Sequence, residues 1–249
     1  MARSFLLALI AGAGLVGYVT IRPEQQWILW LTSAVAALAT DGLVRTHPRW
    51  QGPEAIWSLP VLFLPAAATL GAGLFIDHAI DGYARPLCAL GGAVAVGVIA
   101  FGEYHTVDVG TRVFGAMRLL LAVGTYLTAF ALYSVIFSRD VPIAASAAMI
   151  GVISLGLALE LLRETYLIGP SSLFVSAAVG VSLAELRLVL YFFPLDGLLA
   201  GALLIIAFYF ATGIVHHLLD QDLESATLAE YLMVGGGGAA AVVLTRLFV

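Results

Sequence analysis

Charged side chains interrupt a stretch of the chain that is otherwise apolar enough to form two membrane-spanning helices. The stretch runs from Leu157 to Tyr191, and Gly169 and Pro170 supply a turn in its middle. Its charged residues are Glu160, Arg163, Glu164, Glu185 and Arg187. Charges inside the hydrocarbon core of a membrane are costly, and they usually have a partner or a function. These residues are therefore the first candidates for the chemistry of this protein.

Glu185 is expected close to the middle of the second helix of this stretch. At 1.5 Å of rise per residue, it lies roughly 21 Å from the turn. Its candidate partners at the same depth are Ser182, one helical turn earlier, and Ser154 on the preceding helix. A carboxylate at this depth suggests a role in moving a small solute or relaying protons, and a structural role is the alternative.

Glu160 is expected to form an ion pair inside the membrane. It lies roughly 13 Å from the turn, at about the depth of Arg118 on an earlier helix. We predict a pair between Glu160 and Arg118, with Arg163 as the alternative partner close in the chain. Arg187 follows Glu185 by two residues, about 200° around a helix, so these two cannot pair on one face. Arg118 and Arg187 are otherwise expected to extend toward the membrane interface.

Histidines and carboxylates near another helix end suggest a metal or haem site as an alternative chemistry. His216, His217 and Asp220 follow an apolar segment, and His216 and Asp220 have the i, i+4 spacing of ligands on one helix face. Counting alternate crossings places Glu103 and His105 on the same side of the membrane. However, the sequence has no HExxH motif, and histidines at a helix C-terminus also stabilise the helix dipole. We therefore predict no cofactor, and we name these residues as the metal candidates.

The composition indicates the fold class. The 249 residues are 61% hydrophobic and 11% charged, with a mean hydropathy of +1.03. Soluble proteins are about half apolar and about a quarter charged. We predict an all-α, polytopic transmembrane helix bundle with about nine spans (eight to nine), a single domain over residues 1–249 and no soluble domain. The net charge of −5 is spread over many loops, which argues against nucleic-acid binding.

Apolar segments near 20 residues long mark the expected spans. Their ranges are 4–21, 27–44, 56–76, 86–101, 111–137, 142–168, 172–193, 197–218 and 228–248. Pro60 and Pro65 should kink or break the third span, and the glycine-rich fourth span is expected to be partly re-entrant. Residues 12–17 match the GxGxxG pattern of dinucleotide-binding proteins. Because they lie inside an apolar span, we interpret them as a helix-packing motif.

These patterns leave three functions open. The leading hypothesis is a multi-pass membrane protein that translocates a small solute or relays protons through Glu185. The alternative is an accessory or assembly subunit of a larger membrane complex. The third hypothesis is an intramembrane enzyme or a metal- or haem-binding subunit, although no set of catalytic residues is recognised. The expected partners are membrane lipid and other membrane subunits or further copies of the chain. The expected location is a bacterial or archaeal plasma membrane, with a cytoplasmic N-terminus because arginines slightly favour that side.

Overall fold

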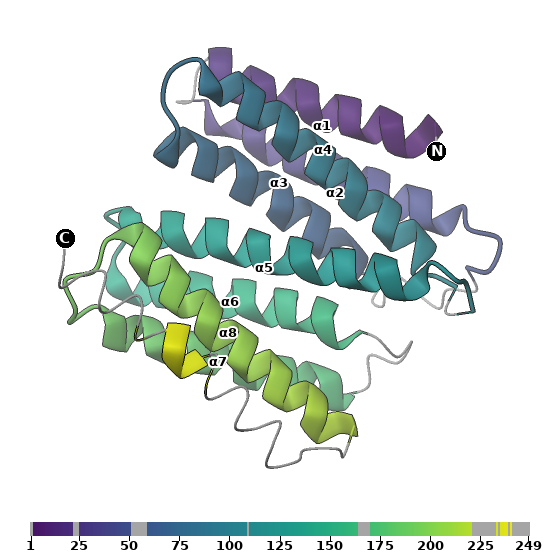
Figure 1. The fold of residues 1–249 in the computed structure, drawn as a ribbon. Coiled ribbons are helices and arrows are strands. Elements are labelled where there is room, and N and C mark those ends of the chain that lie inside the picture. Colours follow the sequence, from purple (N-terminus) through teal and green to yellow (C-terminus); the bar gives the residue numbers. More distant parts are fainter. Residues whose placement is uncertain are drawn as a thin grey trace. The chain divides into compact units, whose positions relative to one another are not determined.

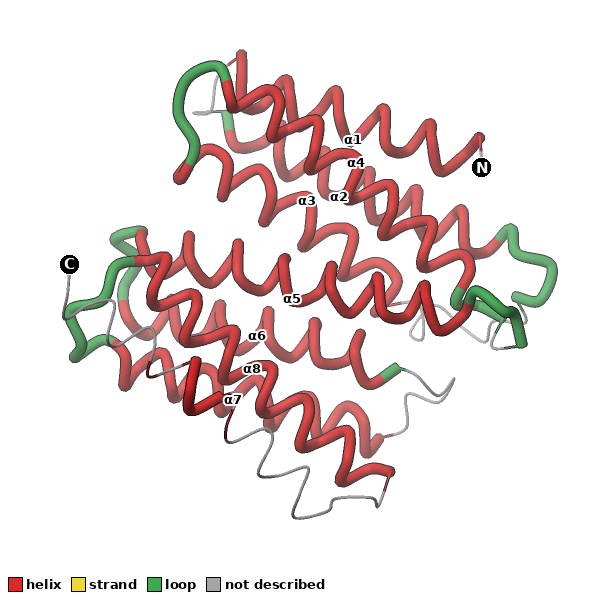
Figure 2. Tube along the Cα trace, in the orientation of Figure 1, coloured by secondary structure: helices red, strands yellow, loops and turns green. Residues whose placement is uncertain are grey.

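The computed structural model describes residues 2–21, 25–50, 59–108, 110–163 and 170–220, together with 233, 235–238 and 240. Within these ranges, helix is the only regular secondary structure (Figure 2). The long helices are α1 (Ala2–Ile21), α2 (Gln26–Arg45), α3 (Leu59–Ala79), α4 (Ala84–His105), α5 (Phe114–Ser138), α6 (Ile143–Leu162), α7 (Pro170–Leu190) and α8 (Gly197–Asp220). The predicted all-α fold class is therefore confirmed for the described residues.

Seven helices, α2 to α8, are long and apolar enough to cross a membrane by length and composition. The hydrocarbon core is about 30 Å thick and needs about 20 apolar helical residues. The described apolar part of α1, Leu6–Thr20, is shorter than this. The predicted count of about nine spans is not confirmed, and most of the ninth expected span lies outside the described residues. The arrangement is that of an apolar multi-helix bundle, as a membrane-embedded protein requires.

The chain divides into two compact units, residues 1–131 and 132–249, and α5 contributes residues to both. In the first unit, α1 packs against α2 and α4, and α3 packs against the same two helices (Figure 1). Leu15 and Tyr18 of α1 are buried in its core with Leu29 of α2. A Cβ at Gly12 would lie 3.1 Å from Ala93 of α4, and one at Gly14 would overlap Thr32 of α2. The interpretation of residues 12–17 as a packing motif is therefore confirmed.

The structure corrects the predicted break in the third span and the predicted form of the fourth, whereas a kink at Pro65 stays a prediction. The helix α3 continues through Pro65, and Pro60 is its second residue, where the missing N–H has no partner to lose. The Ser33 hydroxyl of α2 donates a hydrogen bond of 2.9 Å to the carbonyl of Ala66, next to Pro65. The fourth segment is the continuous 22-residue helix α4, so the prediction of a partly re-entrant segment is wrong.

In the second unit, α6 and α7 form a closely packed pair, and α8 contacts both (Figure 1). Glycines allow the close approach of α6 and α7, because a Cβ at Gly180 would lie 2.6 Å from the carbonyl oxygen of Gly151. The end of α5 meets the start of α8 in a similar way. A Cβ at Gly201 would lie 3.0 Å from the Cα of Ser134 and would overlap its hydroxyl. Small residues four positions apart allow helices to approach closely in a membrane.

Candidate functional site

Glu185 lies on the exposed side of α7. Among the described residues, none forms a hydrogen bond or an ion pair with its side chain. Because α7 ends at Leu190, Glu185 lies about 7.5 Å from that helix end and not at the middle of the span. The α6-facing side of α7 is made by Gly180 and Ala184, both of which contact Gly151. Glu185 follows Ala184 by about 100° around the helix, so it is turned away from the contact with α6, the helix that carries its candidate partner Ser154.

The two serines expected beside Glu185 have different environments. Ser182 is exposed on α7, one turn before Glu185. Ser154 of α6 is fully buried, where its hydroxyl donates to the Ile150 carbonyl at 2.7 Å and accepts from the Tyr133 hydroxyl at 2.6 Å. The structure therefore brings Ser182, but not Ser154, to the Glu185 side of α7.

Glu160 is buried near the end of α6, and the alternative partner predicted for it is confirmed. A guanidinium nitrogen of Arg163 donates to its Oε1 atom at 2.9 Å. Arg163 is the C-cap residue that follows α6, so the pair lies at the helix end. Arg118 belongs to the first unit, and a Glu160–Arg118 pair stays a prediction. Glu164 lies outside the described residues.

Arg187 has an environment that the sequence did not suggest. Its side chain is only 5% exposed, so other residues of the chain enclose it, and its extension to the membrane interface stays a prediction. The guanidinium carbon lies 4.3 Å from the ring centroid of Phe137, at the end of α5. Its Nε and Nη1 atoms are enclosed and have no hydrogen-bond partner among the described residues. Arg187 is therefore a buried cation whose described contact is an aromatic ring.

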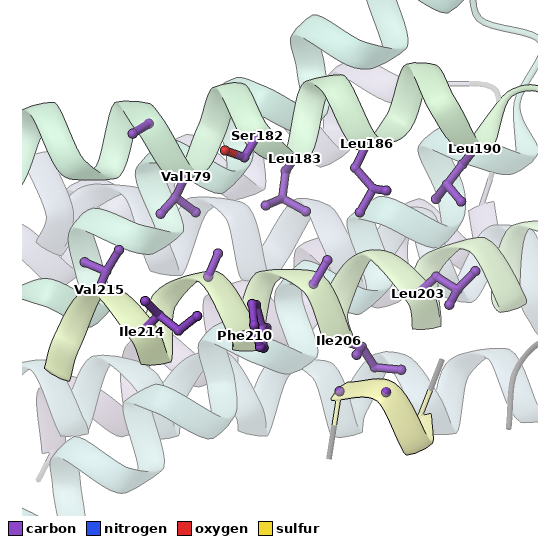
Figure 3. Close-up of a pocket in the computed structure, with 15 residues that line it drawn as sticks. Val179, Ser182, Leu183, Leu186, Leu190, Leu203, Ile206, Phe210, Ile214 and Val215 are labelled. Carbon is purple, nitrogen blue, oxygen red and sulfur yellow. The ribbon is translucent and has the colours of Figure 1, made fainter. Parts of the chain in front are cut away.

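An apolar groove of about 670 Å³ lies between α7 and α8 (Figure 3). Leucines and isoleucines of the two helices face each other across it, and Ser182 has the only polar side chain among the 15 described residues that line it. Gly235 and Gly236 form one edge beside Ile206 and Phe210 of α8. We call this cavity the α7/α8 groove. Its chemistry suits a hydrocarbon better than a polar solute.

The predicted metal ligands are divided between the two units. Glu103 and His105 are on α4, where Glu103 is buried and the His105 ring contacts Phe101 with centroids 4.3 Å apart. His216 and His217 are near the end of α8, with ring centroids 6.1 Å apart. Asp220 ends α8, and its side chain is not among those described. Within the described part of the chain, no group of three or more His, Cys, Asp or Glu is placed to hold a metal ion, so metal binding stays without support.

Sequence reasoning missed three features of the second unit. The serines and glycines that join α5 to α8 have a spacing visible in the sequence, Ser134 with Ser138 and Gly197 with Gly201. The inward orientation of Arg187 and the α7/α8 groove have no such signal. Both depend on how α7 is rotated against its neighbours, which hydropathy does not encode.

Comparisons with known proteins give a family but no activity. No curated protein and no solved structure matches the chain. A family model described as "Protein of unknown function (DUF5656)" matches residues 5–245. Because this match covers nearly the whole sequence, the chain belongs to the DUF5656 family of proteins of unknown function.

Proposed function

We propose that this chain is an accessory or assembly subunit that binds a transmembrane helix of another membrane protein. The binding surface is the exposed side of α7, formed by Ala178, Val181, Ser182, Glu185 and Leu188, which we call the α7 outer face. The observation that carries the proposal is the exposure of Glu185 within a segment apolar enough to span a membrane.

A carboxyl group on this surface would meet lipid chains if nothing else covered it. Acidic residues in membrane spans almost always face other protein or water, and they pair with polar groups there. Ser182 lies three residues before Glu185 and is also exposed, so the two side chains share one face. A partner helix with a hydrogen-bond donor or a cation at this depth would satisfy both residues.

The spacing of small residues on the α7 outer face also favours a helix as the partner. Ala178 and Ser182 are four residues apart, and both are exposed. Small residues at this spacing let two helix backbones approach closely in a membrane, where dispersion contacts and hydrogen bonds drive association. Val181 and Leu188 supply apolar contact area beside them.

The transport hypothesis receives less support from the same residues. A polar solute or a proton needs a wetted path with several polar groups along it. The α7/α8 groove is lined almost entirely by hydrocarbon side chains. No described residue forms a hydrogen bond or an ion pair with Glu185 that would extend such a path. A binding surface therefore accounts for an exposed carboxyl group more simply than a transport route does.

Site-specific photo-crosslinking tests the proposal. A photoreactive amino acid at Val181, on the α7 outer face, should cross-link to a second membrane protein in the native membrane. Val152 on α6 is the matched control, since both valines are strongly exposed, at 58% and 64%. Labelling from Val181 but not from Val152 is the expected result. Equal labelling from both positions would show non-specific collisions and would contradict the proposal.

A second substitution ties the cross-link to the carboxyl group. Glu185→Leu should remove most of the Val181 cross-link, because leucine fills similar space but offers no polar contact. A cross-link that is unchanged in Glu185→Leu would mean that Glu185 does not hold the partner. A product with twice the mass of the chain would identify a second copy in place of another subunit. Solute flux that depends on Glu185, without a specific cross-link, would favour the transport hypothesis.

A further inference from the structure

The surroundings of Arg187 point to a ligand at a site that shares only Ala178 and Ser182 with the α7 outer face. We propose that the second unit binds one anionic phospholipid. Its phosphate lies at the Arg187 guanidinium, and one of its acyl chains fills the α7/α8 groove. Arg187 and the groove are separate observations, and each specifies one end of the same amphiphilic molecule.

The first observation is a buried positive charge without an anion beside it. Arg187 is 5% exposed, and its Nε and Nη1 donors have no hydrogen-bond partner among the described residues. Contact with the Phe137 ring offsets only part of the cost of removing a cation from water. The third nitrogen of the guanidinium, Nη2, is not among these enclosed atoms, and through it Arg187 could donate a charge-assisted hydrogen bond to a phosphate.

The depth of Arg187 in the span matches the position of a lipid headgroup. Arg187 lies three residues before the end of α7 at Leu190, which is about 4.5 Å along the helix axis. A phosphate at the membrane interface lies at a similar level, whereas one deep in the hydrocarbon core would be strongly disfavoured. The headgroup can therefore reach Arg187 without leaving the interface.

The groove is lined by residues of α7 that lie within one helical turn of Arg187 on either side. Two of its lining residues lie on the same side of α7 as Arg187. Leu183 is four residues before Arg187, and Leu190 is three residues after it. From Leu190 the lining extends along α7 to Val179, about 16 Å away by helix rise. This length is close to half of the roughly 30 Å hydrocarbon core, which is the depth of one lipid leaflet.

The chemistry of the groove selects a hydrocarbon chain. Apart from Ser182, its described lining consists of Ala, Val, Leu, Ile, Phe and Gly residues. Its volume of about 670 Å³ falls in the range of about 300–1,000 Å³ that holds small ligands in proteins. Figure 3 shows Leu186, Leu190 and Val179 of α7 pointing toward α8. An acyl chain in this space would complete the loose packing between α7 and α8.

Native mass spectrometry of the full chain in detergent, after removal of copurified lipid, tests the proposal. The probes are phosphatidylglycerol, phosphatidylcholine with the same acyl chains, and inorganic phosphate. The wild-type chain should bind one phosphatidylglycerol about tenfold more tightly than phosphatidylcholine. Both lipids offer a phosphate to Arg187, but the choline cation of phosphatidylcholine offsets its negative charge and weakens the attraction to the guanidinium. Arg187→Gln should remove this preference, because it weakens the binding of phosphatidylglycerol more than that of phosphatidylcholine. Arg45→Gln is the matched control, since Arg45 is an exposed arginine paired with Asp41 near the end of α2.

A second variant tests the acyl-chain end without changing Arg187. Ala207→Phe places a ring in the groove and should weaken the binding of both lipids by a similar factor. This variant, together with Arg187→Lys, keeps the test informative if Arg187→Gln does not fold. Arg187→Lys should retain part of the preference, because it keeps the charge and loses the planar guanidinium.

Several outcomes would overturn the proposal. One is equal affinity of the wild-type chain for the two lipids, and another is a phosphatidylglycerol preference that survives Arg187→Gln. Unchanged lipid binding in Ala207→Phe would show that the chains do not enter the groove. Inorganic phosphate that displaces phosphatidylglycerol would indicate a site for a free anion. Lipid-free dimers that Ala207→Phe disrupts would mean that a second copy of the chain occupies the groove.

Discussion

The hydroxyl oxygens of Tyr133 and Ser154 lie 2.6 Å apart in the interior of the second unit. Ser154 donates its own hydrogen to the Ile150 carbonyl, so Tyr133 is the donor in the bond between them. Both residues are fully buried, on α5 and α6, and the Tyr133 ring contacts Phe208 of α8 edge-on, with centroids 6.3 Å apart. One tyrosine therefore links three helices of this unit.

Removal of the Tyr133 hydroxyl should weaken the second unit modestly. We expect Tyr133→Phe to lower the free energy of unfolding by about 0.5–1.5 kcal/mol, as for hydrogen bonds between membrane helices. Unfolding in mixed detergent micelles, followed by circular dichroism, measures this change. A double-mutant cycle with Ser154→Ala should give a favourable coupling energy. Fully additive effects would show that the bond contributes nothing to stability.

The contact between α6 and α7 should be sensitive to a single methyl group. A Cβ at Gly180 would lie 2.6 Å from the Gly151 carbonyl oxygen and 3.1 Å from the Cβ of Leu155. Because backbone atoms must move to admit it, Gly180→Ala should destabilise the protein by about 1–3 kcal/mol. Thermal unfolding in detergent measures the effect.

Gly91 on α4 provides the matched control for that substitution. A Cβ there would meet no described atom within 4 Å, and alanine is favoured over glycine inside a helix by about 0.5–1 kcal/mol. Gly91→Ala should therefore be neutral or slightly stabilising. Equal losses of stability in the two variants would contradict close packing as the role of Gly180.

Neutralising Glu160 should also destabilise the second unit. The Glu160 side chain is 1% exposed, and that of its partner Arg163 is 16% exposed. Removing one member of a buried pair leaves the charge of the other poorly solvated. Glu160→Gln should therefore lower the free energy of unfolding by on the order of 1–3 kcal/mol. This is at the low end of the values for buried pairs, because Arg163 reaches solvent. The loss should be smaller when Arg163→Gln is combined with it. If the double variant loses the full sum of both single effects, the pair does not act as a unit.

The exposed ion pair of the first unit should contribute little. Arg49 bonds to the Asp108 carboxylate at 2.5 Å, but its side chain is 68% exposed. Arg49→Gln should therefore change the free energy of unfolding by less than about 1 kcal/mol, and added salt should reduce this further. Asp108→Asn tests the other partner, whose Oδ1 atom also accepts from the Gly110 N–H. A large, salt-independent loss in Arg49→Gln would contradict this expectation.

The sequence by itself determined that this protein is an apolar helical bundle. Long apolar segments with few charges allow little else, because backbone polar groups in a membrane must be satisfied within each helix. The sequence also identified the packing role of residues 12–17 and the Arg163 partner of Glu160. Both rest on neighbours along one helix, where spacing alone decides which residues share a face.

Only the tertiary structure decided which way Glu185 and Arg187 point. Gly151 and Gly180 fix the rotation of α7 against α6 by close backbone contact, and this rotation turns Glu185 outward and Arg187 inward. The groove between α7 and α8 depends on the same rotation and on the position of α8, whose Gly197 and Gly201 pack closely against the end of α5. Hydropathy gives the depth of a residue in the membrane, but the direction of its side chain depends on contacts between helices.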